Sequence, residues 1–241
     1  MILNHTHNII VIVIVVVLKP TRLPLKITSQ AKSNKEVNPD TSCLCFLSEL
    51  HTGQVNCVEA NTFKPNLIAS GGASEVYISN IEVDVGNPEV MLTGNPNHHQ
   101  GSIVNAVSWN KKVPHILASS SSNRVTVVWD LKTVQPIFNF KDNSTYDAAV
   151  SLSWNPEIPT QLAVAYDDDR SNEIQIWDLR NPQGPVMVLE GQHSKGIRSL
   201  DWCTSDSSLL LSAGKDQKLV CWNYKTMQAI QEFSIEEDPI A

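Results

Sequence analysis

Residues 191–223 read GQHSKGIRSLDWCTSDSSLLLSAGKDQKLVCWN and contain one complete copy of a unit that the rest of the chain repeats. It contains three short runs rich in apolar residues, Ile197–Trp202, Leu209–Ala213 and Lys218–Trp222, separated by polar turns. Runs of this length bounded by turn residues are typical of β-strands. Three of them in succession predict an antiparallel meander.

Three markers of this stretch recur upstream. The first ends the third strand of a unit: Trp129-Asp130, Trp177-Asp178 and Trp222-Asn223. The second ends the first strand: Trp109, Trp154 and Trp202. The third precedes the first strand: His51, His99 and His193. The second members of the three dipeptides are 48 and then 45 residues apart. A period of 40 to 50 residues with a Trp-Asp ending predicts the blades of a β-propeller.

The markers divide the chain into three parts. An atypical segment covers residues 1–50, the repeat region covers 51–233, and an acidic tail covers 234–241. The repeat region splits into four units at 51–94, 95–141, 142–190 and 191–233. The first unit has Ala60 and Ser79 where the others have tryptophan, so we expect it to pack less well. The prediction is an all-β chain of about four blades in an open or incomplete ring.

The complete unit resembles the WD-repeat β-propeller family. The resemblance implies that His193, Ser212, Asp216 and Trp222 form a hydrogen-bonded relay inside the blade. A Ser, a His and an Asp close in space also suggest a hydrolase triad, but the sequence has no G-x-S-x-G motif to support it. We therefore favour a structural role, in which buried polar groups satisfy one another. Unit two carries Asn123 at the position of Asp216, so we expect its relay to be incomplete.

Composition excludes several classes of function. A formal charge of −7 and a pI near 5.4 argue against a nucleic-acid or anionic-membrane surface. The five cysteines form no C-x-x-C pair and predict reduced thiols in the cytosol, with Cys57, Cys203 and Cys221 as small core residues. The run Asp167–Asp169 lies outside any calcium-loop motif and is typical of a solvated turn. We expect no catalytic residue, cofactor or metal.

Residues 1–50 lack the repeat. Ile9–Leu18 is an uninterrupted run of ten apolar residues, half of what a membrane-spanning helix of about 20 residues needs. It could be a signal-peptide core, but no Lys or Arg precedes it, which favours a buried strand or a stretch foreign to the parent fold. Pro20–Ser42 is polar and predicts a linker, and residues 43–47 predict an edge strand.

The loops carry a finer resemblance than the blade pattern. It rests on HTGQVNCVEAN at 51–61, PNLIASGGASEVYI at 65–78, SWNKKVPHILASSSSNRVTVVWDLK at 108–132, WNPEIPTQLAVAYDDDRSNEIQIWDLRNP at 154–182 and HSKGIRSLDWCTSDSSLLLSAGKDQKLVCWN at 193–223. These segments are similar to consecutive blades of the large outer-cage subunit of coat protein complex II, the coat of vesicles that leave the endoplasmic reticulum.

This resemblance implies a non-enzymatic scaffold for transport from the endoplasmic reticulum to the Golgi. The implied place is the cytoplasm, at exit sites and on coated vesicles, with membrane association only through the coat. The implied partners are coat subunits, including the smaller WD-repeat subunit, and no nucleic acid. Four units stand where that family's propeller has seven, so we expect a partial or truncated relative whose two open ends need a partner. The alternative is a general WD-repeat adaptor that presents peptides within another complex.

Overall fold

The structure is a computed structural model, and it describes residues 51, 53–80, 90–92, 99, 101–141, 148–170, 172–181 and 183–234. Several predictions therefore lie outside the described residues: the segment 1–50 with its apolar run, linker and edge strand, and the tail from residue 235 onward. The loop 142–147 at the start of the third unit lies outside them as well.

In the part of the chain that the structure describes, sixteen strands form four antiparallel sheets, and each sheet is a four-stranded meander. The first blade consists of β1 (Cys57–Ala60), β2 (Leu67–Gly71), β3 (Val76–Asn80) and β4 (Val90–Leu92). The second consists of β5 (Val104–Trp109), β6 (Ile116–Ser121), β7 (Val125–Asp130) and β8 (Gln135–Lys141). The third consists of β9 (Ala149–Trp154), β10 (Gln161–Tyr166), β11 (Ile174–Asp178) and β12 (Met187–Leu189). The fourth consists of β13 (Ile197–Trp202), β14 (Leu209–Gly214), β15 (Lys218–Asn223) and β16 (Gln228–Ser234).

The register places the two repeated tryptophans on one face of the second, third and fourth blades. In the fourth blade Trp202 pairs with Leu210, and Leu210 pairs with Trp222. The same three-residue row recurs in the other blades as Trp109–Leu117–Trp129, Trp154–Leu162–Trp177 and Ala60–Ile68–Ser79. Because alternate residues of a strand share a face, one row fixes the whole pattern of buried side chains.

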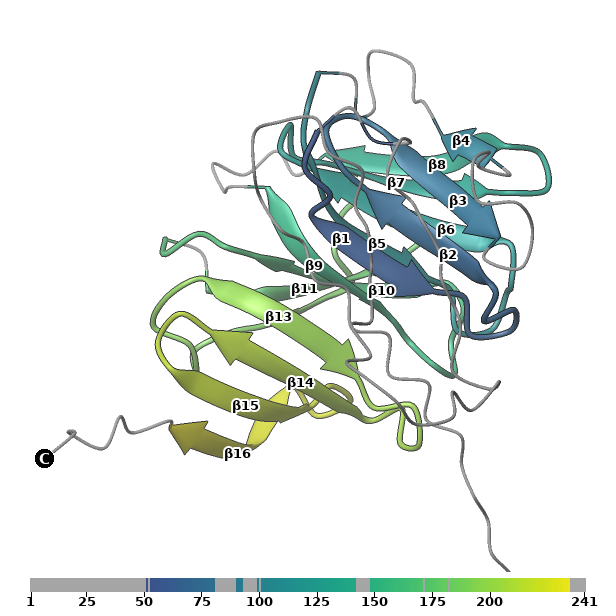
Figure 1. Cartoon of the computed structure of the whole chain (residues 1–241). Coiled ribbons are helices and arrows are strands. Elements are labelled where there is room, and N and C mark those ends of the chain that lie inside the picture. Colours follow the sequence, from purple (N-terminus) through teal and green to yellow (C-terminus); the bar gives the residue numbers. More distant parts are fainter. Residues whose placement is uncertain are drawn as a thin grey trace, which may run out of the picture.

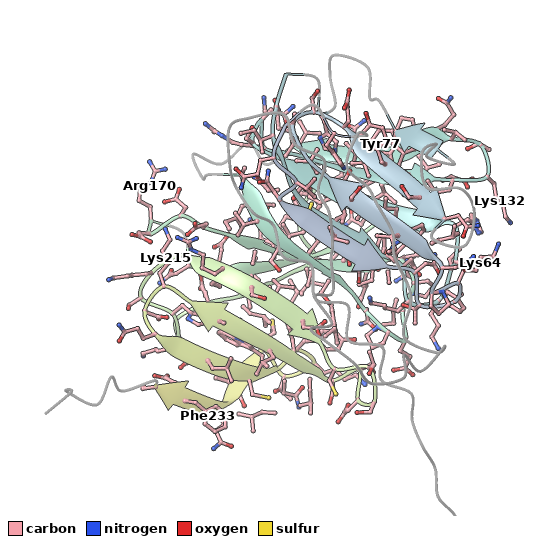
Figure 2. The ribbon with its side chains drawn as sticks, in the orientation of Figure 1. Lys64, Tyr77, Lys132, Arg170, Lys215 and Phe233 are labelled. Carbon is pink, nitrogen blue, oxygen red and sulfur yellow. The ribbon has the colours of Figure 1, made fainter. Side chains whose placement is uncertain are left out.

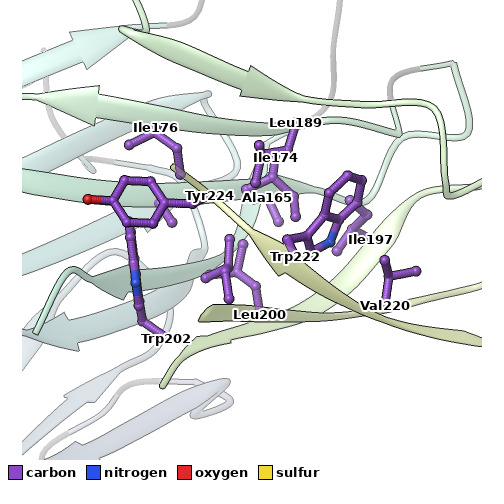
Figure 3. Close-up of a cluster of buried hydrophobic side chains, with 12 residues drawn as sticks. Ala165, Ile174, Ile176, Leu189, Ile197, Leu200, Trp202, Val220, Trp222 and Tyr224 are labelled. Carbon is purple, nitrogen blue, oxygen red and sulfur yellow. The ribbon is translucent and has the colours of Figure 1, made fainter. Parts of the chain in front are cut away.

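The blades stack face to face in chain order, with their first strands β1, β5, β9 and β13 side by side (Figure 1). Figure 1 shows the series running from the blue first blade to the yellow-green fourth blade, which lies at the far end of the stack. Figure 3 shows the last interface, where Trp202, Trp222 and Tyr224 of the fourth blade face Ile174 and Ile176 of the third. The prediction of an all-β propeller arc of four blades is confirmed.

The first blade lacks the bulk of the other three. At the third-strand tryptophan position, the Ser79 hydroxyl is buried and has no hydrogen-bond partner among the described residues. A buried hydroxyl without a partner destabilises a fold by about 1–3 kcal/mol. The first blade is therefore expected to be less stable for two reasons: it lacks the indole rings, and it buries a hydroxyl group without a partner.

Val134, in the turn between β7 and β8, adopts a left-handed backbone with φ of 55°. A β-branched side chain is strained in that region, whereas asparagine tolerates it. We expect Val134→Asn to raise the free energy of unfolding by about 1 kcal/mol. Thermal denaturation of the purified chain measures the effect. Met227 has the same φ in the fourth blade but is not β-branched, so Met227→Asn should gain less; an equal or larger gain there would contradict the explanation.

Candidate functional site

The relay residues of the fourth blade meet inside that blade. His193 Nδ1 lies 3.1 Å from Asp216 Oδ1, and His193 Nε2 lies 2.8 Å from Ser212 Oγ. Trp222 Nε1 donates to the same Ser212 oxygen at 2.8 Å. The turn that follows β14 brings Asp216 back over the histidine, and its carboxylate also accepts the N–H of Ser194 at 2.8 Å.

The distances within this group resemble those of a hydrolase triad. Unlike the residues of a triad, however, these side chains are not accessible to a substrate. Ser212 is only 1% exposed and His193 only 3% exposed, and the hydroxyl already interacts with both the imidazole and the indole. Burial opposes ionisation of Asp216, but the N–H of Ser194 and the His193 side chain outweigh it and lower the pKa of the carboxyl group. A serine sealed on all sides cannot reach a substrate, so the geometry fits a structural relay.

The second blade corrects the expectation of an incomplete relay. His99 Nε2 lies 2.7 Å from Ser119 Oγ, which also accepts the indole N–H of Trp129 at 2.7 Å. Ser121 connects the histidine to Asn123, because its hydroxyl lies 2.6 Å from His99 Nδ1 and donates to Asn123 Oδ1 at 2.6 Å. The relay is thus complete, with a serine inserted where the fourth blade has Gly214.

In the third blade, different residues provide the hydrogen-bond acceptor for the indole N–H of the third-strand tryptophan. The indole N–H of Trp177 donates to Gln175 Oε1 at 3.0 Å, and the hydroxyl of Tyr166 donates to the same oxygen at 3.0 Å. Tyr166 occupies the position of Ser121 and Gly214 in the register. Sequence reasoning missed Gln175, although a glutamine among the apolar residues of a buried strand was a usable signal.

The first blade retains part of the relay. His51 Nε2 lies 2.8 Å from Ser70 Oγ, and the ring packs edge-on against Tyr77 with centroids 4.6 Å apart. The other ring nitrogen is buried without a hydrogen-bond partner among the described residues. Burial lowers the pKa of His51, against the opposing effect of Glu75.

The second residue of each closing dipeptide, Asp130, Asp178 or Asn223, caps the turn after the third strand. Asp130 Oδ1 accepts the N–H of Lys132 at 2.8 Å, and Asn223 Oδ1 accepts the N–H of Lys225 at 3.1 Å. Asp178 accepts both the N–H and the guanidinium of Arg180, at 3.0 Å and 2.9 Å to Oδ1. The Arg180 side chain lowers the pKa of Asp178 to about 2, although burial acts in the opposite direction.

Arg180→Gln should lower the stability of the chain at pH 7 and weaken the dependence of its stability on acid pH. Since Asp178 has a pKa below that of an unfolded aspartate, near 3.9, its ionised form stabilises the folded chain above that value. The stabilisation is lost as the pH falls from about 4 towards 2, and the variant should lose much of this pH dependence while being less stable at pH 7. Urea denaturation of the variant and the parent at pH 7, 4 and 3 measures the free energy of unfolding at each pH. Parallel curves for the variant and the parent would contradict the assignment.

A repeated asparagine that the sequence analysis did not single out connects neighbouring blades. It follows the first strand and precedes a proline by four positions: Asn61 with Pro65, Asn110 with Pro114, and Asn155 with Pro159. Each Oδ1 accepts main-chain N–H groups of its own turn. Asn61 Nδ2 also donates to the Pro114 carbonyl of the next blade at 2.9 Å, and Asn110 Nδ2 to the Pro159 carbonyl at 2.8 Å. The recurring N-x-x-x-P spacing was the available signal.

The acidic run is only in part the solvated turn that the sequence predicts, because Asp169 is exposed while Asp167 and Asp168 are held in ion pairs. Asp168 is buried and its Oδ2 lies 2.7 Å from the guanidinium of Arg170. Lys215, from the fourth blade, lies 2.5 Å from Asp167 Oδ1 and 3.3 Å from Asp169 Oδ1. Figure 2 shows Arg170 and Lys215 on the same rim of the stack. The run therefore joins the third blade to the fourth.

Cys57, Cys203 and Cys221 are free thiols of intermediate burial, and Cys57 packs against the apolar cluster of the first two blades, as expected for a small core residue. Burial raises the pKa of the Cys57 thiol to about 12. In the part of the chain that the structure describes, no group of three or more His, Cys, Asp or Glu is placed to hold a metal ion. Across those same residues, no helix has the length and apolar character needed to cross a bilayer.

The repeated blades and their buried relays define the class of this protein. The family described as "WD domain, G-beta repeat" matches residues 91–130 and 183–223, and the described residues form four blades of a WD-repeat β-propeller. Within that class it resembles the Sec31 transport proteins. It is 40% identical over 201 residues to the protein transport protein Sec31A of Danio rerio, which covers 83% of this chain and 16% of that protein.

Other comparisons agree with this resemblance. The protein transport protein SEC31 of Dictyostelium discoideum is 39% identical over 212 residues, 88% of this chain and 15% of that protein. The chain thus spans about one sixth of the length of these relatives. The solved structure "COPII on membranes, outer coat vertex" matches with a TM-score of 0.68 at 30% identity, over 76% of this chain and 50% of that one. The similarity to a chain of the mitotic checkpoint complex, at 23% identity and a TM-score of 0.66, shows the fold alone.

Proposed function

We propose that the chain is a non-enzymatic scaffold related to the outer layer of the vesicle coat that serves transport from the endoplasmic reticulum to the Golgi. The observation that carries the proposal is identity of 39–40% to Sec31 transport proteins over more than 200 residues. That length exceeds the repeat region, so the resemblance extends beyond the marker residues that all WD repeats share. The likeness to the outer coat vertex supports the same conclusion.

The architecture supports a scaffold physically. Stacked blades joined by side-chain hydrogen bonds form a rigid platform, and a propeller by itself supplies a surface for partners. The Ser-His-Asp group, which offers the strongest resemblance to a catalytic centre, is sealed within the fourth blade. A net charge of −7 favours protein partners over phosphate-rich ones.

The proposed partners are subunits of the coat, among them the smaller WD-repeat subunit. The proposed location is the cytoplasm, at exit sites of the endoplasmic reticulum and on coated vesicles. Contact with the membrane would then be indirect, through the rest of the coat.

Affinity purification of the tagged chain from cells, followed by blotting for the smaller WD-repeat subunit, tests the proposal. We expect that subunit to be recovered in excess over a control purification with a tagged WD propeller from an unrelated complex. Light microscopy should place the tagged chain at exit sites. Recovery of ubiquitin-ligase or chromatin subunits without coat subunits would favour the general adaptor and overturn the coat proposal.

A further inference from the structure

Three turns of the first two blades meet on one rim of the stack, after β1, β5 and β7. Asn61 Nδ2 of the first turn donates to the Pro114 carbonyl of the second turn at 2.9 Å. The Leu131 N–H of the third turn donates to the His115 carbonyl of the second turn, also at 2.9 Å. Because each turn is bonded to the next, the three turns form one continuous surface.

Each of these turns presents an exposed lysine, and we call the surface the lysine rim: it carries Lys64, Lys112 and Lys132. Figure 2 shows Lys64 and Lys132 on the same side of the molecule, across the view from Arg170 and Lys215. Among the residues that the structure describes, the ammonium groups of the three rim lysines form no ion pair. Three like charges on adjoining turns repel one another, so a negatively charged partner would relieve the repulsion.

Two carboxylates of the same rim are already engaged. Glu59 pairs with Lys111 at 2.6 Å and accepts the main-chain N–H of Trp109 at 2.5 Å. Asp130 Oδ1 accepts the main-chain N–H of Lys132 at 2.8 Å, which leaves the ammonium group of that lysine available. Four lysines against these two carboxylates leave the described part of the rim with a net positive charge, in a chain whose formal charge is −7.

Two exposed apolar side chains accompany the lysines. Phe63 precedes Lys64 and is 48% exposed, and Val134 ends the third turn and is 41% exposed. Val134 also has the left-handed backbone that a β-branched residue adopts only at a cost in stability. Strained residues often occur where a protein contacts a ligand, and apolar residues bordered by charges are typical of interaction surfaces. The lysine rim therefore combines the two features of a surface for an amphipathic partner.

The fourth blade has the same turn with a different charge balance. Lys225 lies two residues after the closing dipeptide, as Lys132 does in the second blade. An exposed carboxylate stands near it: the hydroxyl and N–H of Ser208 lower the pKa of Asp206, and Lys225 adds to this effect against burial. The charge of Lys225 is thus balanced within its own blade, which makes this lysine a matched control for the rim.

The size of the charged surface indicates the kind of partner. A short acidic segment that lies on the rim interacts mainly with the rim lysines, because charges more than about 8 Å apart are screened at physiological salt. A bilayer or a nucleic acid duplex would also face the acidic remainder of the chain, which repels it. Apolar side chains beside the lysines offer further contact area to a protein segment, so the observations favour a protein partner.

We propose that the lysine rim, formed by Phe63, Lys64, Lys112, Lys132 and Val134, is a binding surface for an acidic segment of a partner protein. Carboxylates of that segment pair with the three ammonium groups. An apolar side chain of the same segment packs on the exposed phenylalanine and valine. The surface is available to such a segment whether or not the chain serves in a vesicle coat.

Fluorescence anisotropy of the whole chain with a short labelled peptide of alternating glutamate and leucine tests the charges. We expect the peptide to bind and the Kd to rise with added salt. The Kd should rise about tenfold or more in the triple variant Lys64→Glu, Lys112→Glu and Lys132→Glu, because three exposed ion pairs become repulsive contacts. Lys225→Glu should change the Kd by less than about twofold, and a peptide with glutamine in place of glutamate should not bind.

Val134→Asn separates binding from folding, because it is expected to raise stability and yet to weaken peptide binding about threefold through the loss of apolar contact. Met227→Asn, at the corresponding position of the fourth blade, should leave the Kd unchanged.

Four results would overturn the proposal. The first is that the whole chain does not bind the peptide. The second is that Lys225→Glu weakens binding as much as the triple variant, since diffuse charge would then explain the attraction. The third is tighter binding, through the same three lysines, to vesicles that contain phosphatidylserine, which would assign the surface to a membrane. The fourth is a carbodiimide cross-link from a rim lysine to a carboxylate elsewhere in the same chain that the peptide cannot displace, because the chain itself would then fill the surface.

Discussion

Trp154→Ala is expected to lower the free energy of unfolding by about 3–5 kcal/mol, the cost of removing a large aromatic side chain from a core. Trp154 is fully buried, and its Nε1 donates to the Ser108 carbonyl of the preceding blade at 3.0 Å. The substitution therefore leaves a cavity and an unsatisfied carbonyl at the junction of the second and third blades. Urea denaturation followed by circular dichroism measures the loss.

Phe63→Ala is the matched control for this variant. Phe63 is also aromatic but is about half exposed, and its removal should change stability by no more than about 0.5 kcal/mol. Equal losses for the two variants would contradict the claim that the blades are held together through the first-strand tryptophans.

Gly214→Val is expected to destabilise the chain by about 3 kcal/mol or more, whereas Gly214→Ser should cost no more than about 1 kcal/mol. A Cβ atom at Gly214 would lie 2.5 Å from His193 Nδ1 and would also touch Asp216. Valine would push an apolar group between these buried partners. A serine hydroxyl can bridge them instead, as Ser121 does in the second blade.

Thermal and urea denaturation of the two Gly214 variants, carried out in parallel, measure the loss of stability in each. Equal destabilisation would show that the space between the histidine and the turn cannot hold a bridging hydroxyl. The comparison separates steric crowding, which both side chains share, from the loss of the buried hydrogen bonds, which only valine causes.

The buried relay shows that a Ser, a His and an Asp within hydrogen-bond distance are not sufficient evidence for catalysis. His193, Ser212 and Asp216 are within hydrogen-bond distance in the order of a charge relay. Their neighbours decide the outcome, because the Trp222 indole donates to the serine oxygen that a hydrolase would need free. In the third blade Gln175 replaces the whole group and still satisfies a tryptophan, as expected if the need is structural.

The repeat itself could be predicted from sequence because one row of residues fixes each blade. Trp202 and Trp222 recur at a constant period, and the period-two geometry of strands assigns every other side chain to a face. The rest depends on contacts across blades, which no single repeat reveals. Asp167 is bound by Lys215 from 48 positions further along the chain, and Asn110 by a carbonyl 49 positions away. Such pairs become neighbours only when the stacking is known.

The indole N–H groups offer the most direct test of the stacked-blade architecture. All six tryptophans of the chain donate a hydrogen bond: three to a serine or glutamine of their own blade, and the first-strand three to carbonyls at Glu59, Ser108 and Ser207. Nitrogen-15 NMR of the whole chain in deuterated water should show six dispersed indole signals that exchange slowly. First-strand indole signals that exchange at the rate of free tryptophan would contradict the stacking of these four blades.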